Sequence, residues 1–195
     1  MERGPIPPPS AILSPRASSH EENVAEKAPD RIWLHELSDL LAWYEDNLCA
    51  VGARDPRDHF VKFTPERFPH LIKLHRKGSN KEVKSPQKQV IAIREKKRGN
   101  ADFGGYECER AQTFPWILPA ILRPTKILEL IAQPLIGAEK TGDVLYVKEF
   151  ENTQRRYRFK IVVCRKVAPK LLVPVTCHPR EHARYSPTQY KQVWP

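Results

Sequence analysis

The hydrophobic period of the chain changes between its two halves, and this change limits the folds that the sequence can adopt. In the first half, apolar residues recur at three- and four-residue steps, as they do in amphipathic helices. In the last third, the runs GDVLYVKEF, RRYRFKIVVCRK and KLLVPVTCHP are short, rich in Val, Ile, Leu and Tyr, and separated by ENTQ and VAP. Helices followed by strands predict an α+β fold in which these three strands form a small antiparallel β-meander.

The N-terminal part predicts a disordered leader followed by one helix. Residues 1–29 are rich in Pro and Ser and hold few side chains to bury. They contain no continuous apolar stretch, so neither a secretory signal nor a membrane span is expected, and the protein is predicted to be cytoplasmic with no membrane contact. Residues 30–52 predict an amphipathic helix with Asp30 as N-cap and Gly52 after its end. Its apolar face could pack on the same domain or bind a partner.

The segment KFTPERFPHLIKLHRKG, residues 62–78, carries strong helix-start signals. Thr64 is expected as the N-cap and Pro65 as the first helical residue, where its missing N–H leaves no hydrogen bond unmade. These features follow from the physics of helix initiation and need no function. Arg67 and His70 are the polar residues of this segment that have no such structural explanation.

The middle of the chain gives weaker patterns. SPQKQVIAIREKKRG has a Ser-Pro start and a Gly stop, which favours a helix, although QVIAI would also fit a strand. NADFGGYE predicts a glycine-bearing loop. TFPWILPAILRPTKILELIAQP predicts one or two short helices between prolines.

The charge of the chain is uneven and indicates a polyanionic partner. The formal net charge is +10, but residues 1–60 hold six Lys and Arg against eleven Asp and Glu. Residues 61–100 hold twelve Lys and Arg against three acids. A basic body of this kind favours nucleic acid, with an acidic membrane surface or an acidic protein as alternatives.

Metal and cofactor motifs are not apparent. His70 and His75 are five residues apart and would point to different sides of a helix. Pro179 lies between His178 and His182, which disfavours a metal-binding helical turn. The four cysteines form no CxxC pair and are expected to be reduced thiols. DFGGYE lacks the rest of a phosphate-binding loop, and no GxSxG or SxxK motif is present. We therefore predict no metal and no cofactor.

Basic and histidine residues remain as the candidates for chemistry. Cleavage of RNA without a metal needs a base for the 2′-OH, an acid for the leaving 5′-oxygen, and cations for the phosphorane. In YRFKIVV, Arg158 and Lys160 share one face of a strand and Phe159 lies on the other. A cationic face is expected of an RNA platform, but any half-solvated sheet also has a polar face. The catalytic candidates are His70, Arg67, Lys160, Thr176 and His178, and the RNA-binding candidates are Lys148, Arg158, Arg165 and Arg180.

The order of the segments resembles the phage-associated members of the barnase/EndoU/colicin/RelE-like ribonuclease superfamily. In those domains a helix with a TxERxxHI-like motif precedes an NPxxI-like segment and a VTA[YH]-like strand. The matching residues here are Thr64, Glu66, Arg67, His70 and Leu71, then Pro124 and Ile127, then Val175 and Thr176. The resemblance covers residues 60 to about 185 of the predicted domain at 60–190. It departs from the pattern in a basic insertion at 78–113 and in a last strand that continues as TCHPREH.

The resemblance implies a barnase/RelE-like fold and a metal-independent endoribonuclease, toxin-like or phage-derived, that cleaves RNA through a 2′,3′-cyclic phosphate. It also implies RNA as partner and a possible acidic antitoxin or immunity protein. The alternative is a non-catalytic protein that keeps the nuclease-like fold and binds nucleic acid or another protein. A third possibility is a protein-interaction module at residues 31–50, with Trp33, Trp43 and Tyr44 as anchors.

Overall fold

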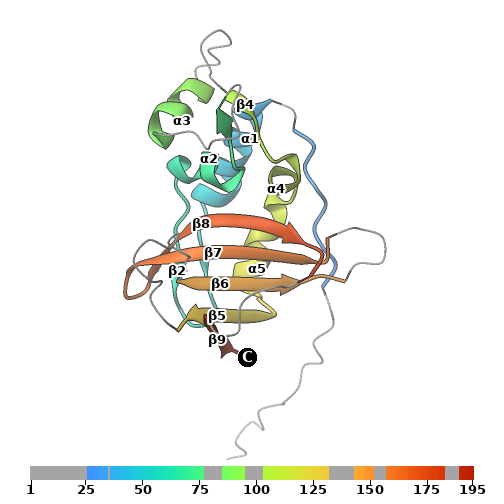
Figure 1. Ribbon diagram of the computed structural model, residues 1–195, viewed down its shortest axis with the longest axis vertical. Helices are drawn as coiled ribbons and strands as arrows, with labels where there is room; N and C mark the ends of the chain where they lie inside the picture. Colours follow the sequence, from blue (N-terminus) through green and yellow to red (C-terminus); the bar gives the residue numbers. More distant parts are fainter. Residues whose placement is uncertain are drawn as a thin grey trace, which may run out of the picture.

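A layer of short helices packs against a curled seven-stranded sheet in the computed structural model (Figure 1). The structure describes residues 26–34, 36–76, 85–94, 103–131, 143–151, 157–182 and 189–195. The α+β class predicted from the sequence is confirmed. The predicted leader lies for the most part outside the described residues, as does part of the basic insertion at 78–113. No helix within the described ranges is long and apolar enough to cross a bilayer.

The sheet is larger than the predicted meander and is mixed. Its strand order is β1-β2-β8-β7-β6-β5-β9. The three strands predicted from the last third pair in succession as antiparallel neighbours, but β2 joins β8 in parallel at Phe60↔Leu171. The strands are β1 Ala53–Arg54, β2 Phe60–Val61, β5 Lys126–Leu130, β6 Val144–Glu149, β7 Phe159–Ala168, β8 Leu171–Arg180 and β9 Tyr190–Trp194. A separate two-stranded sheet pairs β3 His75–Arg76 with β4 Phe103–Gly105.

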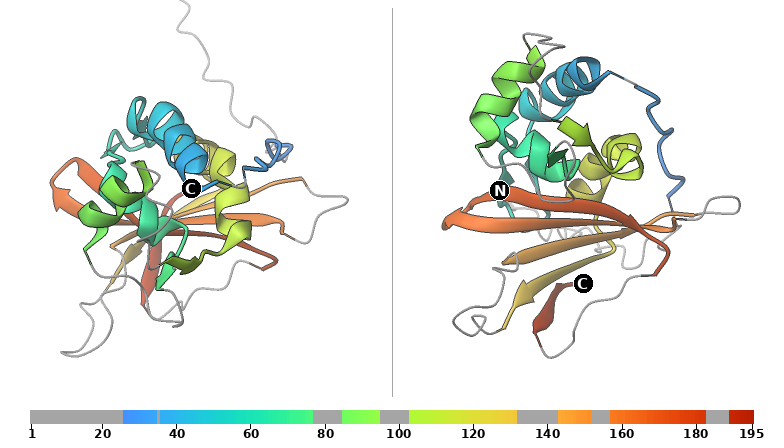
Figure 2. Two further views of the ribbon diagram at one scale, coloured as in Figure 1. Left: turned by 90° about the horizontal axis from the view of Figure 1, so that it is seen from above. Right: turned by 45° about the horizontal axis from the view of Figure 1, so that its top comes forward.

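The helical layer covers one face and one edge of the sheet. In the right-hand view of Figure 2, helices α1 to α4 gather on one side of the strands. Helices α2 and α4 contact β8, and α5 contacts β6 and β7. The helices are α1 Leu37–Tyr44 with a π-helical turn Glu45–Cys49, α2 Phe68–Leu71 after a 3-10 turn Pro65–Arg67, α3 Pro86–Arg94, α4 Cys108–Gln112, and α5 Ile117–Leu122 after a 3-10 turn Phe114–Trp116.

The first helix begins at Leu37, seven residues later than the sequence indicates. The backbone N–H of Ile32 donates to the carbonyl of Gln112, so this stretch runs along the end of α4 instead of bonding within a helix. Trp33 is 65% exposed as a result. The apolar stripe that follows does bury, because Leu40, Leu41, Tyr44 and Leu48 all belong to the core between helices and sheet.

The helix predicted over residues 62–78 is much shorter than expected. Thr64 forms no side-chain capping bond, and the helical residues end at Leu71. Lys73 has φ of 53°, its N–H donates to the carbonyl of His70, and the N–H of Leu74 donates to the carbonyl of Pro69. These are the two hydrogen bonds of a Schellman helix end, here with Lys73 where glycine is usual. The chain then enters β3.

Other segments divide between confirmed and wrong predictions. The helix predicted from SPQKQVIAIREKKRG is confirmed as α3. KILEL, predicted as helical, forms strand β5 because it pairs with both β6 and β9. Part of the predicted glycine-bearing loop forms β4. Strand β9 and helix α4 were not predicted.

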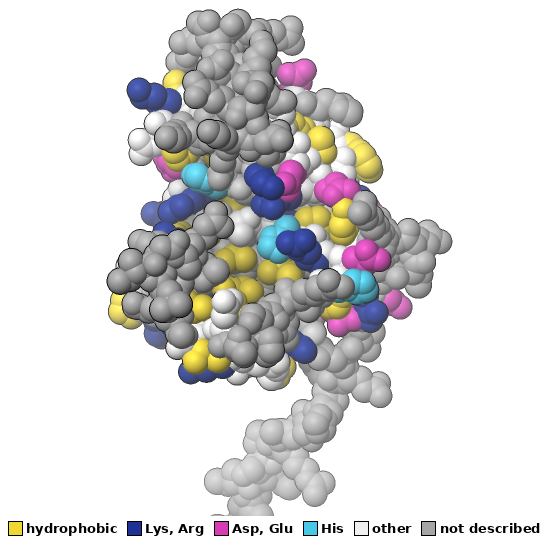
Figure 3. Space-filling model, viewed as in Figure 1, with side chains coloured by type: hydrophobic (Ala, Val, Ile, Leu, Met, Phe, Trp, Pro, Cys, Tyr) yellow, Lys and Arg dark blue, Asp and Glu magenta, His cyan; other side chains and the backbone are white. Residues whose placement is uncertain are grey.

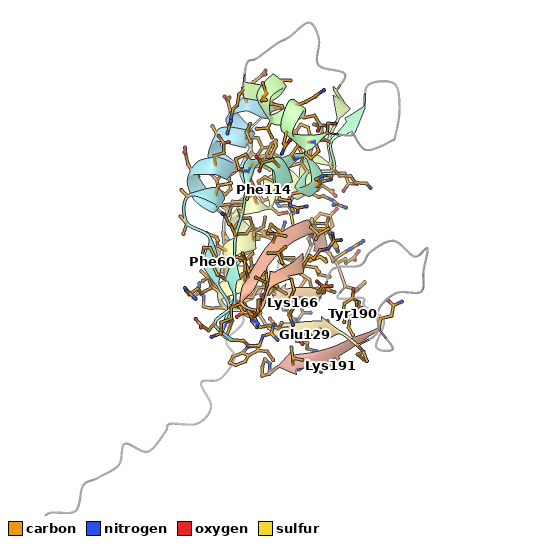
Figure 4. All side chains as sticks on the ribbon, turned by 90° about the vertical axis from the view of Figure 1, so that its left-hand side faces the viewer. Phe60, Phe114, Glu129, Lys166, Tyr190 and Lys191 are labelled. Atoms are coloured by element: carbon orange, nitrogen blue, oxygen red, sulfur yellow. The ribbon has the colours of Figure 1, made fainter. Side chains whose placement is uncertain are left out.

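Two apolar clusters lie on opposite faces of the sheet. The larger cluster fills the space between helices and sheet, and it includes Val162 and Cys164 from β7. The smaller cluster includes Ile161 and Val163 from the same strand, because alternate residues of a strand point to opposite faces. Figure 4 shows Phe114 inside the helical layer and Tyr190 at the far end of the sheet.

Candidate functional site

The cationic face predicted for β7 is the face that the helices cover. Lys160 alternates with Phe159 and Ile161 as expected, but its side chain is 0% exposed. Its ammonium donates a hydrogen bond to Thr113 Oγ1 at 2.9 Å, from the junction after α4. Lys160 therefore cannot line a solvent-facing RNA platform. Both faces of β7 carry apolar residues, so the sequence did not show which face would be covered.

The other cations expected on this platform are held by acids. Lys148 Nζ lies 3.2 Å from Glu26 Oε2, and its side chain is only 12% exposed. Arg158 pairs with Glu149, and its guanidinium lies 5.9 Å from the centre of the Phe159 ring. These pairs neutralise much of the positive charge that the sequence led us to expect here.

The remaining predicted residues meet on the opposite face, along β8. Thr176, His178 and Arg180 lie directly across from Val163, Ile161 and Phe159 of β7. A bulge between β7 and β8 shifts the register after Val163. By alternation along β7, Arg165 lies on this same face of the sheet.

Helix α4 contributes an arginine to this part of β8. Arg110 Nη1 donates to Thr176 Oγ1 at 2.8 Å, and its Nε pairs with Glu107. Lys73 Nζ, just after α2, lies 2.6 Å from Glu107 Oε1. We call Lys73, Glu107, Arg110, Thr176, His178 and Arg180 the β8 cluster. Figure 3 shows histidine, basic and acidic side chains gathered near the centre of this face, above apolar ones.

The environment keeps His178 uncharged. Burial, together with the positive charges of Arg180, Arg110 and Lys160, lowers the pKa of His178 to about 3. Partial burial acts to raise the pKa of Glu107, but hydrogen bonds from Lys73 and Arg110 outweigh it, so this pKa is lowered. At neutral pH the cluster thus presents a neutral imidazole among three cations and one carboxylate.

The predicted helix residues Arg67 and His70 are not among the groups with the largest effects on the pKa of His178. The positive charge of Arg67 acts on Tyr44 and on Glu66, on the side of α1. One contact between α2 and β8 is made by Leu71, whose carbonyl accepts a hydrogen bond from the Cys177 thiol at 3.8 Å. The role predicted for Arg67 and His70 at this site stays a prediction.

Sequence reasoning missed Lys73, Glu107 and Arg110. Two of them lie in the stretch that the sequence indicated as a basic insertion. The i,i+3 spacing of Glu107 and Arg110 was a signal that both side chains could share one helix face. Their meeting with β8 depends on how α4 packs, and no local pattern shows that.

A second polar group lies under the β1–β2 hairpin and has a structural role. The buried carboxylate of Asp55 accepts hydrogen bonds from Tyr146 Oη at 2.8 Å and from the backbone N–H groups of Arg57 and His59. Arg57 continues to Glu129, which also pairs with Lys166 (Figure 4). Burial and the Asp55 charge raise the pKa of Tyr146. These bonds fasten the hairpin to β5 and β6.

No three His, Cys, Asp or Glu side chains group as metal ligands within the described ranges. Comparison with protein-family models, with characterised proteins and with solved structures finds no match to this chain. Function is therefore inferred from the side chains of the β8 cluster and their chemistry.

Proposed function

We propose that this chain is a metal-independent endoribonuclease, a divergent member of the barnase/EndoU/colicin/RelE-like superfamily, with the β8 cluster as its active site. The observation that carries the proposal is a neutral, partly buried His178 that shares one face of β8 with Arg180 and with Thr176, the residue to which Arg110 donates. A neutral imidazole can accept a proton, and adjacent guanidinium groups can stabilise the negative charge of a phosphorane.

The proposed reaction transfers the phosphodiester to the ribose 2′-oxygen. The imidazole of His178 takes the proton of the 2′-OH as the 2′-oxygen attacks phosphorus. Arg110 and Arg180 stabilise the charge on the non-bridging oxygens. The bond from phosphorus to the 5′-oxygen breaks, and that oxygen takes a proton from the ammonium of Lys73. The products are a 2′,3′-cyclic phosphate and a free 5′-hydroxyl.

A bound phosphate would also prepare His178 for this role. In the free protein, nearby cations disfavour the imidazolium. A phosphodiester placed among them brings negative charge, which offsets the cations and raises the proton affinity of the imidazole. The base would thus become stronger when substrate binds.

The positive charges on this face of the sheet also indicate what kind of protein could inhibit the enzyme. A protein inhibitor of a nuclease with this charge would be acidic, as an antitoxin or immunity protein of a toxin-like or phage-derived enzyme would need to be. A complementary acidic surface would reach Arg180, which is exposed at the end of β8.

The test is cleavage of a labelled oligoribonucleotide by the full-length protein in EDTA. We expect cleavage with 2′,3′-cyclic phosphate ends, none of a strand with 2′-deoxyribose throughout, and a large loss of rate in His178→Ala and in Arg110→Ala. His182→Ala is the matched control, because His182 is exposed just beyond the same strand. The His70→Ala variant tests the role predicted for α2.

Three results would overturn the proposal as stated. They are a requirement for added metal, full activity in His178→Ala, and cleavage lost in His70→Ala but kept in His178→Ala. Salt-dependent RNA binding without cleavage would instead identify the non-catalytic alternative.

A further inference from the structure

The ammonium of Lys160 is buried, and among the residues that the structure describes it has no charged partner. Its side chain is 0% exposed, and no carboxylate of the described residues lies within ion-pair distance of it. Placing a cation in a protein interior is unfavourable unless its donors are used well. Because the buried ammonium is energetically unfavourable, a specific role would explain why a lysine occupies this position.

One hydrogen bond of Lys160 reaches the end of α4. Its ammonium donates to Thr113 Oγ1 at 2.9 Å, and the Thr113 hydroxyl in turn donates to the backbone carbonyl of Glu109 at 2.9 Å. Thr113 is fully buried and is the residue at which α4 passes into the following 3-10 turn. The last carbonyls of a helix have no partner inside the helix and favour a nearby cation. Arg110 lies three residues before this junction.

A second link reaches the end of α2. Cys177 on β8 pairs with Val162, two residues from Lys160 on the same face of β7, and its thiol is close enough to influence the pKa of Lys160. The same thiol donates to the carbonyl of Leu71, the last residue of α2. Lys73 follows two residues later, in the turn that ends this helix. Lys160 therefore lies between the ends of the two helices that supply Lys73 and Arg110 to the β8 cluster.

We propose that Lys160 is a positioning residue: its buried ammonium fixes the ends of α2 and α4 against β7 and β8, and so holds Arg110 on Thr176 beside His178. The kinetic consequence of this inference rests on the proposed function, whereas the positioning itself does not. Because Lys160 is enclosed on the helix-covered face, it acts through other residues and does not touch RNA.

The charge of Lys160 has a second, separable effect on the cluster. It is one of the cations that keep the imidazole of His178 neutral. Removing the ammonium should therefore raise the pKa of His178, whereas breaking the hydrogen bond to α4 alone should leave this charge in place.

The experiment compares three variants of the full-length protein. Lys160→Met removes the ammonium from a side chain of similar length. Thr113→Val keeps the ammonium and breaks its link to α4. Lys166→Met is the matched control, because Lys166 lies on the same strand and face but forms a surface ion pair with Glu129.

Two NMR readouts are independent of RNA cleavage. In the wild-type protein, the Nη1 hydrogens of Arg110 should exchange slowly with water because Nη1 donates to Thr176 Oγ1 on β8. We expect this protection to be lost in Lys160→Met and in Thr113→Val and kept in Lys166→Met. The titration of His178 should shift to higher pH in Lys160→Met, and by less in Thr113→Val, which keeps the charge of Lys160 and changes only the position of Arg110.

The kinetic readout is cleavage of an oligoribonucleotide. A loss of alignment at the reacting phosphate predicts that kcat falls about 100-fold in Lys160→Met and in Thr113→Val, with a smaller change in KM. Lys166→Met should stay within about 2-fold. If Lys160→Met does not fold, Thr113→Val decides the question alone.

Protection of Arg110 that is unchanged in every variant that folds would overturn the inference, whether or not the protein cleaves RNA. The wild-type protein could cleave no RNA while the Lys160→Met variant still loses the protection of Arg110. That pair of results would refute the proposed function and support the positioning role.

Discussion

Replacing Lys160 with methionine should stabilise the fold. Burial lowers the pKa of Lys160 from its ordinary 10.5 to about 8. This lowering of the pKa corresponds to about 3 kcal/mol of unfavourable free energy for the charged form at neutral pH. Methionine removes this penalty and loses one hydrogen bond, to Thr113 Oγ1, worth about 1 kcal/mol. The expected net gain at pH 7 is about 2 kcal/mol.

The pH dependence gives this prediction a distinctive sign. Between pH 8 and 10.5 the unfolded lysine still binds its proton and the folded one has lost it. The unfolded state then holds more protons, so the free energy of unfolding of the wild-type protein rises with pH across this window. The penalty is fully present below pH 8. Lys160→Met lacks this rise, so its advantage over the wild-type protein should shrink as the pH approaches 10.5.

Urea denaturation followed by tryptophan fluorescence, at several pH values from 7 to 10, measures both effects. Lys166→Met should differ from the wild-type protein by less than about 1 kcal/mol, because it removes only a surface ion pair. The reasoning is refuted if Lys160→Met is less stable than the wild-type protein at pH 7, or if both proteins gain stability equally between pH 8 and 10. A more stable variant with impaired activity would show that the lysine is kept for function.

Three further changes test other parts of the structure. Asp55→Asn should lower the free energy of unfolding by about 3 kcal/mol in urea titrations, because it removes a buried, multiply hydrogen-bonded carboxylate; a loss below ~1 kcal/mol would contradict this role. Gly52→Ala should lower the thermal midpoint, since Gly52 has φ of 62° and a new Cβ would lie 2.5 Å from Phe60 Cζ. The control Gly105→Ala, which has φ of 137° and no atom within 4 Å of its Cβ, should cost less. His178 titrates near 6.5 when unfolded and about 3 when folded, so the wild-type protein should lose stability as the pH falls through this window, and His178→Gln should lose less; equal acid sensitivity would refute the pKa shift.

Local sequence patterns predicted secondary structure correctly where the composition of a segment favoured one kind of element over the others. The strands β6, β7 and β8 follow from short runs of β-branched and aromatic residues between turn residues. Helix α3 follows from its Ser-Pro start. KILEL was assigned to a helix as part of TFPWILPAILRPTKILELIAQP, which was predicted to form one or two short helices between prolines. Its pairing with β6 and β9 decided the outcome, and these partners are distant in the sequence.

Helix ends were less predictable because long-range contacts set them. The start of α1 is delayed while the backbone at Ile32 bonds to Gln112, eighty residues away. Helix α2 ends at Leu71 because the chain turns at Lys73 and enters β3. The helix-start signals at Thr64 and Pro65 did not extend the helix beyond this turn.

The candidate site shows the same division. Thr176, His178 and Arg180 were named from the sequence, and alternation along β8 brings them to one face of the sheet. Lys73, Glu107 and Arg110 meet them only because α2 and α4 pack on β8. Arg67 and His70 were named as candidates because the rules of helix initiation did not explain them. That reasoning gives no information on how close they lie to β8.

The sequence by itself determined the α+β class, the excess of basic residues, and the alternation of Lys160 with its neighbours along β7. Only the tertiary structure decided which face of β7 the helices cover. Because alternation has the same period on both faces, it cannot tell a solvated cation from a buried one. That choice turned Lys160 from a candidate RNA contact into a buried cation bonded to Thr113 at the end of α4, and left His178 on the opposite face of the sheet.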